Sequence, residues 1–410
     1  MVTGYRKVVL FAVVSTPMIF FSFPSIAMNG PTAIQIDGGP LGEWELTGGV
    51  DGVFYSMTGS QSYSDQEGIN YPGTSNAGAK VSGTALLNSL VQLQKTTGIL
   101  QATIEVGPQN FLYEGLGVTP ASIQSYATGP LNAAYITIAP PNSPVTISFG
   151  QMAGLEGIEA FQDWGNSNIF YSSVSYVEAG YSRGISVNYT QGAFNATAFL
   201  SDGYYTGVFN FLQAQANYTF NSHNILGVFY GGNLGRTGVN THTYGNGRLA
   251  YNDSYVAFAP EFANSQLFGA YYNYTAGNLN LIPEFQFEHA SAQHSLGIQK
   301  PMTNAIAVVF ANYNFSNSPY SLGAWAEYFD QHEGAADAAN ELYWFYGPNA
   351  SGEQVSITPT WQYKDLFARV DFGGLHLNRT SAYGLSPYGY GNQHSTAWQF
   401  TSLFETGFVF

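Results

Sequence analysis

The amino-acid sequence predicts an all-β protein, a transmembrane antiparallel up-and-down β-barrel of about 16 strands around a water-filled lumen. Three observations favour this fold class. Charged residues make up only 9% of the 410 residues, while aromatic residues reach 16%. Segments in which polar and apolar residues alternate recur along the chain, and the connections between them are long and short in turn. The chain also ends on an aromatic-rich segment that closes with Phe410.

Composition excludes several other classes of protein. Disordered chains have few aromatic residues and many charges, the opposite of this sequence. A helical membrane protein needs apolar runs of about 18 residues or more, and the sequence contains none. The formal net charge of −15 disfavours nucleic acid as a partner. An uncharged, aromatic, glycine-rich chain of this kind indicates β-structure in a membrane.

The N-terminus has the features of an export signal. Arg6 and Lys7 precede an apolar stretch over residues 8–23, and Ser25-Ile26-Ala27 is a small-x-small cleavage site. We therefore expect residues 1–27 to be a cleaved signal peptide and residues 28–410 to form the barrel. The alternative is an uncleaved anchor helix, for which the apolar stretch is short. The absence of cysteine fits an exported protein that does not rely on disulfides.

Alternation with a period of two places polar and apolar residues on opposite faces of a strand. At residues 212–220 every even position is apolar or aromatic and every odd position is polar. Residues 353–363 repeat the pattern, with Val355, Ile357 and Tyr363 on one face and Gln354 and Ser356 on the other. A soluble β-sandwich would also alternate. The polar inner set and the aromatic residues at the ends of the apolar set favour a barrel with lipid outside and water within.

This alternation predicts sixteen strands. They lie at residues 43–57, 86–95, 99–107, 131–139, 145–151, 178–190, 193–202, 211–220, 225–233, 265–276, 279–289, 303–315, 319–330, 353–363, 366–376 and 396–410. Short turns are expected on the periplasmic side and long loops outside the cell, as in bacterial outer-membrane barrels. Residues 254–259 also have a strand-like pattern, and we assign them to the fifth long loop or to an extension of the following strand.

Two sets of aromatic residues agree with an orientation in which the short turns are periplasmic. The first set lies just before short turns and predicts a periplasmic girdle at the lipid headgroups: Tyr189, Tyr218, Tyr274, Tyr313 and Tyr363. Three of these tyrosines lie in Asn-Tyr-Thr sequences, and N-glycosylation is the alternative interpretation, but it requires a eukaryotic secretory route. The second set, Phe408 and Phe410, lies on the lipid face of the last strand and is typical of the signal that the barrel-assembly machinery recognises.

Four segments resemble the OmpL-like β-barrel porins of Gram-negative outer membranes. They are the hairpin from Val91–Lys95 to Ile104–Gly107, the stretch Ser148–Gly157, Phe170–Ser173 and Ala326–Asp330. The family often has an arginine two residues before the acidic residue that corresponds to Glu327, whereas Trp325 and Ala326 fill this region here. The resemblance covers most of the chain after residue 27 and implies an outer-membrane porin.

A channel is the function that this fold best predicts, because a sixteen-stranded barrel encloses a lumen wide enough for water. We expect passive diffusion of small hydrophilic solutes and ions through the bacterial outer membrane, with no cofactor and no metal. An enzyme is disfavoured, since none of the seven histidines lies in a recognisable catalytic motif. A non-conducting structural or adhesin-type barrel is the alternative. The expected partners are outer-membrane lipid, the barrel-assembly machinery and small solutes or cations; a homotrimer is a compatible assembly.

Strand phase predicts that the lumen is acidic and therefore prefers cations. Arg369 is the clear cation among the inward residues Glu43, Glu45, Asp51, Glu105, Glu178, Glu284, Glu288, Glu327, Asp371 and Glu405. The loop at residues 152–177 is expected to form the constriction, with a helix over residues 154–162. Its acids, together with four wall residues, are the predicted selectivity site: Glu156, Glu159, Asp163, Glu105, Glu327, Arg369 and Asp371. Two alternatives stay open, namely acids at the rims that only hydrate the surface and a loop packed outside against a neighbouring subunit.

Overall fold

The computed structural model of the chain describes residues 28, 30, 32–58, 82–118, 129–238, 260–332, 344–347, 349–379, 389–390 and 396–410. The predicted signal peptide, residues 1–27, and the strand-like segment at residues 254–259 lie outside these described residues.

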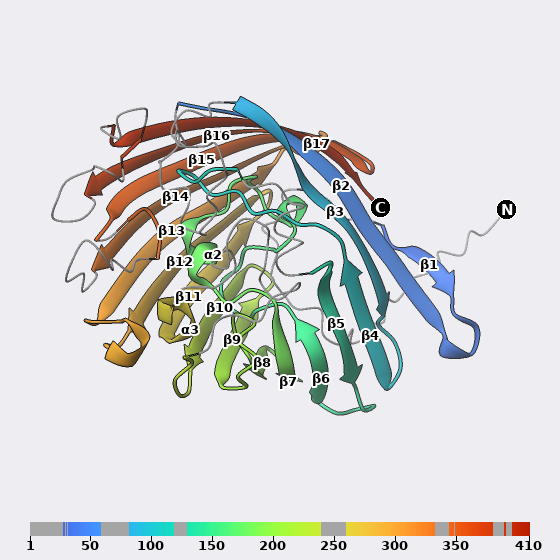
Figure 1. Cartoon of the computed structure of the whole chain (residues 1–410). Coiled ribbons are helices and arrows are strands. Elements are labelled where there is room, and N and C mark those ends of the chain that lie inside the picture. Colours follow the sequence, from blue (N-terminus) through green and yellow to red (C-terminus); the bar gives the residue numbers. More distant parts are fainter. Residues whose placement is uncertain are drawn as a thin grey trace.

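The described strands form a closed antiparallel barrel of sixteen strands, β2 to β17, as the sequence predicts (Figure 1). Each strand pairs with its neighbours in sequence, and β17 closes the barrel on β2, with Phe404 opposite Phe54 and Phe408 opposite Val50. The bounds are β2 Glu43–Met57, β3 Ser82–Lys95, β4 Leu100–Val106, β5 Leu131–Ile138, β6 Val145–Met152, β7 Ser182–Gln191, β8 Phe194–Ser201, β9 Phe211–Asn221, β10 Asn224–Asn233, β11 Ser265–Ala276, β12 Leu279–Ala290, β13 Met302–Asn314, β14 Tyr320–His332, β15 Ser351–Tyr363, β16 Leu366–Arg379 and β17 Trp398–Val409.

A short additional strand, β1 (Ile34–Asp37), precedes the barrel and pairs with the start of β2, from Ile34 opposite Leu46 to Asp37 opposite Glu43. The alternation pattern does not predict this strand. Four exposed residues carry too little alternation to stand out as a strand. The prediction that Glu43 faces the lumen is wrong, because Glu43 lies in this exposed hairpin at the start of β2.

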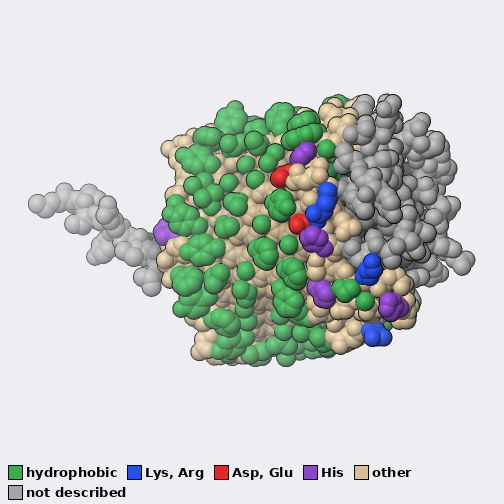
Figure 2. All heavy atoms as spheres, turned by 90° about the vertical axis from the view of Figure 1, so that its left-hand side faces the viewer, with side chains coloured by type: hydrophobic (Ala, Val, Ile, Leu, Met, Phe, Trp, Pro, Cys, Tyr) green, Lys and Arg blue, Asp and Glu red, His purple; other side chains and the backbone are tan. Residues whose placement is uncertain are grey.

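The polar and apolar residues that alternate along β15 lie on the inner and outer faces of the barrel wall, respectively. Val355 and Ile357 are 46% and 49% exposed on the outer face, whereas Gln354 and Ser356 are buried on the inner face. The outer surface of the wall carries hydrophobic side chains over most of its height, and most of the charged and histidine side chains in this view lie toward one rim (Figure 2). This surface is the apolar band that a barrel needs in lipid.

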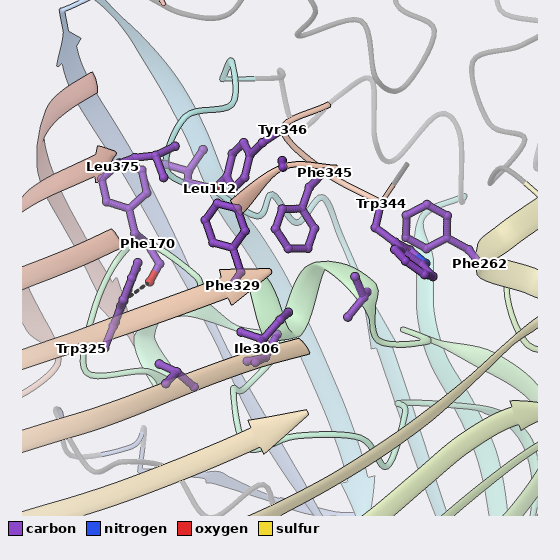
Figure 3. Close-up of a cluster of buried hydrophobic side chains, with 14 of the residues drawn as sticks. Leu112, Phe170, Phe262, Ile306, Trp325, Phe329, Trp344, Phe345, Tyr346 and Leu375 are labelled. Atoms are coloured by element: carbon purple, nitrogen blue, oxygen red, sulfur yellow. Dashed lines mark hydrogen bonds between the residues drawn. The ribbon is translucent and has the colours of Figure 1, made fainter. Parts of the chain in front are cut away.

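Segments of the connections occupy the inside of the barrel. The helix α2 (Ser173–Val177) lies within the ring of strands, and α3 (Pro260–Ala263) precedes β11 (Figure 1). Side chains from these segments and from residues 344–347 pack against the inner faces of β13 to β16, where Phe329, Phe345 and Trp325 form part of a buried cluster (Figure 3). The predicted lumen is therefore largely filled at this level. No helix in the described ranges has the length and apolar character needed to cross a membrane.

The prediction of a helix over residues 154–162 is wrong, because this stretch consists of bends without helical turns. Gly157 adopts a left-handed φ of +65°, and a Cβ there would lie 2.1 Å from the Glu178 carboxylate. The loop thus folds back on itself in a conformation that only glycine fits. The strand predicted from residue 178 begins at Ser182, so Glu178 belongs to the loop and not to the barrel wall.

Candidate functional site

The loop after β6 is attached to the barrel wall through its own backbone. The N–H groups of Ile169 and Phe170 donate to the Asp371 carboxylate on β16 at 2.9 and 3.1 Å, and the N–H of Ser173 donates to Glu327 on β14 at 2.8 Å. Backbone N–H groups buried inside a barrel need acceptors, and a carboxylate is a strong one. The predicted site residues Asp371 and Glu327 therefore hold the loop.

Further side chains of the wall complete this attachment. Ser356 and Thr358 on β15 donate to the two oxygens of Asp371 at 2.7 and 2.9 Å. The indole N–H of Trp325 donates to the Phe170 carbonyl at 3.1 Å, a contact that Figure 3 shows as a dashed line. The loop backbone thus has donors and acceptors from the wall, and the sequence could not indicate these pairs.

Arg369, the inward cation on β16, joins the loop to the place where the barrel closes. Its guanidinium contacts the Glu405 carboxylate on β17 at 2.6 Å and the Asp163 carboxylate of the loop at 3.2 Å. It also donates to the carbonyls of Asp163 and Asn166 at 3.2 and 3.1 Å. The arginine predicted to face an open lumen is instead fully enclosed, because the loop covers it.

The loop acids also make contacts within the loop. The Ala179 N–H donates to Glu156 at 2.6 Å, and the backbone N–H and hydroxyl of Ser172 donate to Glu159. Burial raises the pKa of Glu156 to about 8, because a carboxylate loses its hydration there. Glu156 is therefore mostly uncharged at neutral pH, and it would contribute little negative charge to a pore.

Glu105 on β4 accepts hydrogen bonds from both the wall and the loop. Its carboxylate accepts hydrogen bonds of 2.8 Å each from Gln92 on the wall and from Gln162 and Tyr181 of the loop. Glu105 itself is 3% exposed, whereas the three donors are half-buried. The loop therefore also contacts the wall beside β3 and β4, through side chains that are half-buried.

Two buried residues of this region were not among the predicted site residues. Asn88 on β3 donates to Asp163 at 2.7 Å and to Asp51 at 3.1 Å. Glu114, in the connection after β4, is fully buried, and burial together with the nearby Asp371 raises its pKa well above the usual value. The inward phase of β3 could have indicated Asn88, while nothing in the sequence places Glu114 inside the barrel.

Comparisons with known proteins assign this barrel to a family. The family described as "Putative beta-barrel porin-2, OmpL-like" matches residues 44–410. The chain belongs to this family. A comparison with curated protein sequences finds no match. The OmpL-like chain is accordingly a porin-family β-barrel of the bacterial outer membrane.

Solved structures of outer-membrane channels share the fold of this OmpL-like porin. An anion-selective porin from Comamonas acidovorans has a TM-score of 0.56 at 12% identity, with 90% of this chain and 99% of that chain covered. The channel DcaP of Acinetobacter baumannii has a TM-score of 0.55 at 11% identity over 90% and 97% of the two chains. OmpF of Salmonella typhi in complex with daunomycin has 0.51 at 12% over 92% and 100%. Identities this low establish the fold alone.

The outer face of the OmpL-like barrel carries the predicted girdle and terminal residues. Tyr218, Tyr274, Tyr313 and Tyr363 are exposed beside short turns, and Tyr189 is half-buried at the same end. Phe408 is exposed on the outer face of β17, and the backbone N–H and carbonyl of Phe410 pair with Gly48 at 2.9 Å each. The last residue is thus part of the seam that closes the barrel.

The remaining inward acids of the OmpL-like porin divide into two groups. Asp51 and Glu405 lie beside Arg369, whereas Glu284 and Glu288 on β12 are buried without a basic partner among the described residues. Arg183 has an outward phase on β7 and forms an ion pair of 2.6 Å with Asp202.

Proposed function

We propose that this OmpL-like porin conducts small hydrophilic solutes by passive diffusion and prefers cations. The observation that supports the preference is the charge inside the barrel. Arg369 is the one buried Lys or Arg side chain in the described part of the chain, and it lies beside Asp51 and Glu405, whereas further buried acids have no such partner, among them Glu284 and Glu288. Buried charges of one sign attract the opposite ion and repel their own kind.

The contacts of the loop at residues 152–177 favour its predicted role as the constriction. Its backbone is attached to β14 and β16 through Glu327 and Asp371, so the loop narrows the lumen from that side. The donors around Glu105 on β4 are half-buried, and we propose that water and ions pass beside them. We therefore assign the main selectivity role to Glu105, while Glu156, Glu159 and Asp163 act chiefly by shaping the loop.

Reversal potentials in planar bilayers with a potassium chloride gradient test this function. Wild-type protein should favour potassium over chloride. Glu105→Gln should lower the permeability ratio several-fold, because two unit charges about 4 Å apart interact by about 1–4 kcal/mol between bulk water and a protein surface. The matched control is Glu353→Gln, on the outer face beside His376, which should leave the ratio unchanged. An anion-selective wild-type channel would refute the preference.

The burial of the inward carboxylates favours one other function, a barrel that does not conduct. Asp371, Glu405 and Glu288 are at most 1% exposed, which leaves little water around them. Folded protein that inserts into bilayers and never produces conductance steps would establish this structural role.

The two ends of the chain carry proposals of their own. Export would remove residues 1–27, and mass spectrometry of outer-membrane protein should then find an N-terminus at Met28.

The terminal Phe410 would act as the assembly signal together with Phe408. Deletion of Phe410 should reduce the amount of heat-modifiable barrel in the outer membrane, whereas Phe315→Ala, at an exposed aromatic residue in a short turn, should reduce it less. Normal assembly of the truncated chain would contradict the proposal.

We also propose a homotrimer, in which the short wall formed by β4, β5, β6 and β8 faces the other subunits. These strands have only 7 or 8 residues each. With a rise of about 3.3 Å per residue and a tilt of about 45°, they reach about 16–19 Å, less than the apolar band of about 25 Å. Contact with copies of the same chain would cover this wall, so that it would not face a lipid layer taller than itself.

A further inference from the structure

Three carboxylates from distant parts of the chain meet beside Arg369. Asp51 lies on β2, Glu405 on β17, and Asp163 begins the short 3₁₀ helix Asp163–Gly165 of the loop. One oxygen from each carboxylate lies within 4.8 Å of the other two. All three residues are at most 2% exposed.

The charges of this group do not balance among the side chains present. Arg369 contacts Glu405 at 2.6 Å and Asp163 at 3.2 Å, and it contributes one positive charge against three negative ones. It is the only buried Lys or Arg within the described ranges. A buried charge without a partner is strongly unfavourable, so two further positive charges, or protons, are required here.

Unused oxygen atoms point to the missing partner. Glu405 Oε1 accepts no hydrogen bond from a described residue, although Glu405 is fully buried. The same is true of Asn88 Oδ1, at the end of an amide that is directed into the group, 2.7 Å from Asp163 and 3.1 Å from Asp51 through its nitrogen. Amide oxygen and nitrogen are assigned from their surroundings, and a half-turn of this amide would direct its oxygen into the group instead.

We propose that Asp51, Asp163, Glu405 and Asn88 bind a divalent cation, with calcium as the best match. Calcium takes carboxylate and amide oxygens at about 2.3–2.6 Å, so two of its ligands are at most about 5 Å apart, and the carboxylate oxygens of this group lie close enough together to bind one ion. A doubly charged ion cancels the excess of two negative charges. It also provides the partner that Glu405 Oε1 lacks.

The cation joins three parts of the fold that no single strand pair connects. Asp51 and Glu405 lie on the two strands that close the barrel, and Asp163 belongs to the loop inside it. The next loop residue, Trp164, packs against Phe367 and Val409 at the same seam. The ion therefore fixes the tip of the loop to the closing seam, and this role does not depend on whether the barrel conducts.

Terbium and calcium binding to the full folded protein test the proposal. Protein in detergent is treated with EDTA, and terbium, which replaces calcium, is then added; energy transfer from Trp164 should produce terbium luminescence that excess calcium removes. Trp164→Phe should reduce the luminescence and leave calcium binding in place. Calcium should also raise the temperature at which the barrel loses its heat-modified mobility. No luminescence and no thermal shift in folded protein would overturn the proposal.

Substitutions then separate a cation from shared protons. Asp163→Asn should weaken calcium binding at least tenfold, while the control Glu159→Gln, a loop acid that binds Ser172, should not change it. Asn88→Asp adds a fourth carboxylate, so it should strengthen the response to calcium. If Asn88→Asp lowers stability equally with and without calcium, or if stability responds to pH and not to calcium, the carboxylates share protons and the proposal is wrong.

Discussion

The two sides of the barrel differ in height and in the chemistry of their inner faces. Strands β12 to β17 have 12 to 14 residues each, whereas β4, β5, β6 and β8 have 7 or 8. The tall wall carries Glu327, Asp371 and Arg369 on its inner face. The inner face of the short wall carries mainly hydroxyl and amide side chains, such as Thr137 and Ser148, which hydrogen-bond to each other at 2.7 Å.

This difference explains where the loop lies. Charged acceptors form stronger hydrogen bonds than neutral hydroxyls, and the loop has several N–H groups that need partners away from water. The backbone N–H groups of Ile169, Phe170 and Ser173 therefore bind the tall wall, where Asp371 and Glu327 supply those acceptors, whereas Glu105 on β4 binds side chains of the loop. Around Glu105 on β4 the side chains that bind the carboxylate are half-buried. The asymmetry of the wall thus determines both the anchor and the proposed route of permeation.

The largest expected effect concerns the outer faces of the two walls. If the short wall faces other subunits, benzophenone attached at Phe149→Cys on β6 should photo-crosslink to a second copy of the chain. The same reagent at Ile357→Cys on β15 should not, because this position faces lipid. Both residues are more than 40% exposed, and the chain has no native cysteine. Gel electrophoresis after illumination gives the result, and equal crosslinking at both positions would remove the distinction between the walls.

The second expected effect concerns the inner faces. Asp371→Ala removes the acceptor of two backbone N–H groups and two hydroxyls, and we expect it to lower the free energy of unfolding by about 3 kcal/mol or more. Ser148→Ala on the short wall removes one neutral hydrogen bond and should cost about 1 kcal/mol. Urea unfolding in lipid vesicles measures both values. Similar losses would show that the loop does not depend on the tall wall.

The third expected effect is a dependence on pH at the other end of the loop. The pKa of Glu156 is raised to about 8 in the folded protein from an ordinary value near 4.5, so folding favours its protonated form. This contribution to stability is complete below about pH 4.5 and is lost as the pH rises through 8, with a slope of at most about 1.4 kcal/mol per pH unit. Glu156→Gln, which cannot ionise, should reduce this slope in urea unfolding between pH 5 and 8. An unchanged slope would assign the titration to another group.

The sequence by itself determined the barrel. Alternation with a period of two is a local property, and lipid on one face with polar groups on the other imposes it on every strand. The sixteen strands, their inward and outward phases, and the inward positions of Arg369, Asp371 and Glu327 could therefore be predicted. The four-residue strand β1 could not, since it is too short to show a period.

Only the tertiary structure decided the interior. Ile169 and Asp371 are 202 residues apart in sequence, and their hydrogen bond depends on how the loop folds inside a completed barrel. The close approach at Gly157 replaced the expected helix, and the enclosure of Arg369 by Asp163 and Glu405 required three segments to converge. The physical reason is that a strand pattern specifies which face a side chain occupies, whereas the partners across the lumen are specified by shape, charge and hydrogen bonding among residues with no periodic relation.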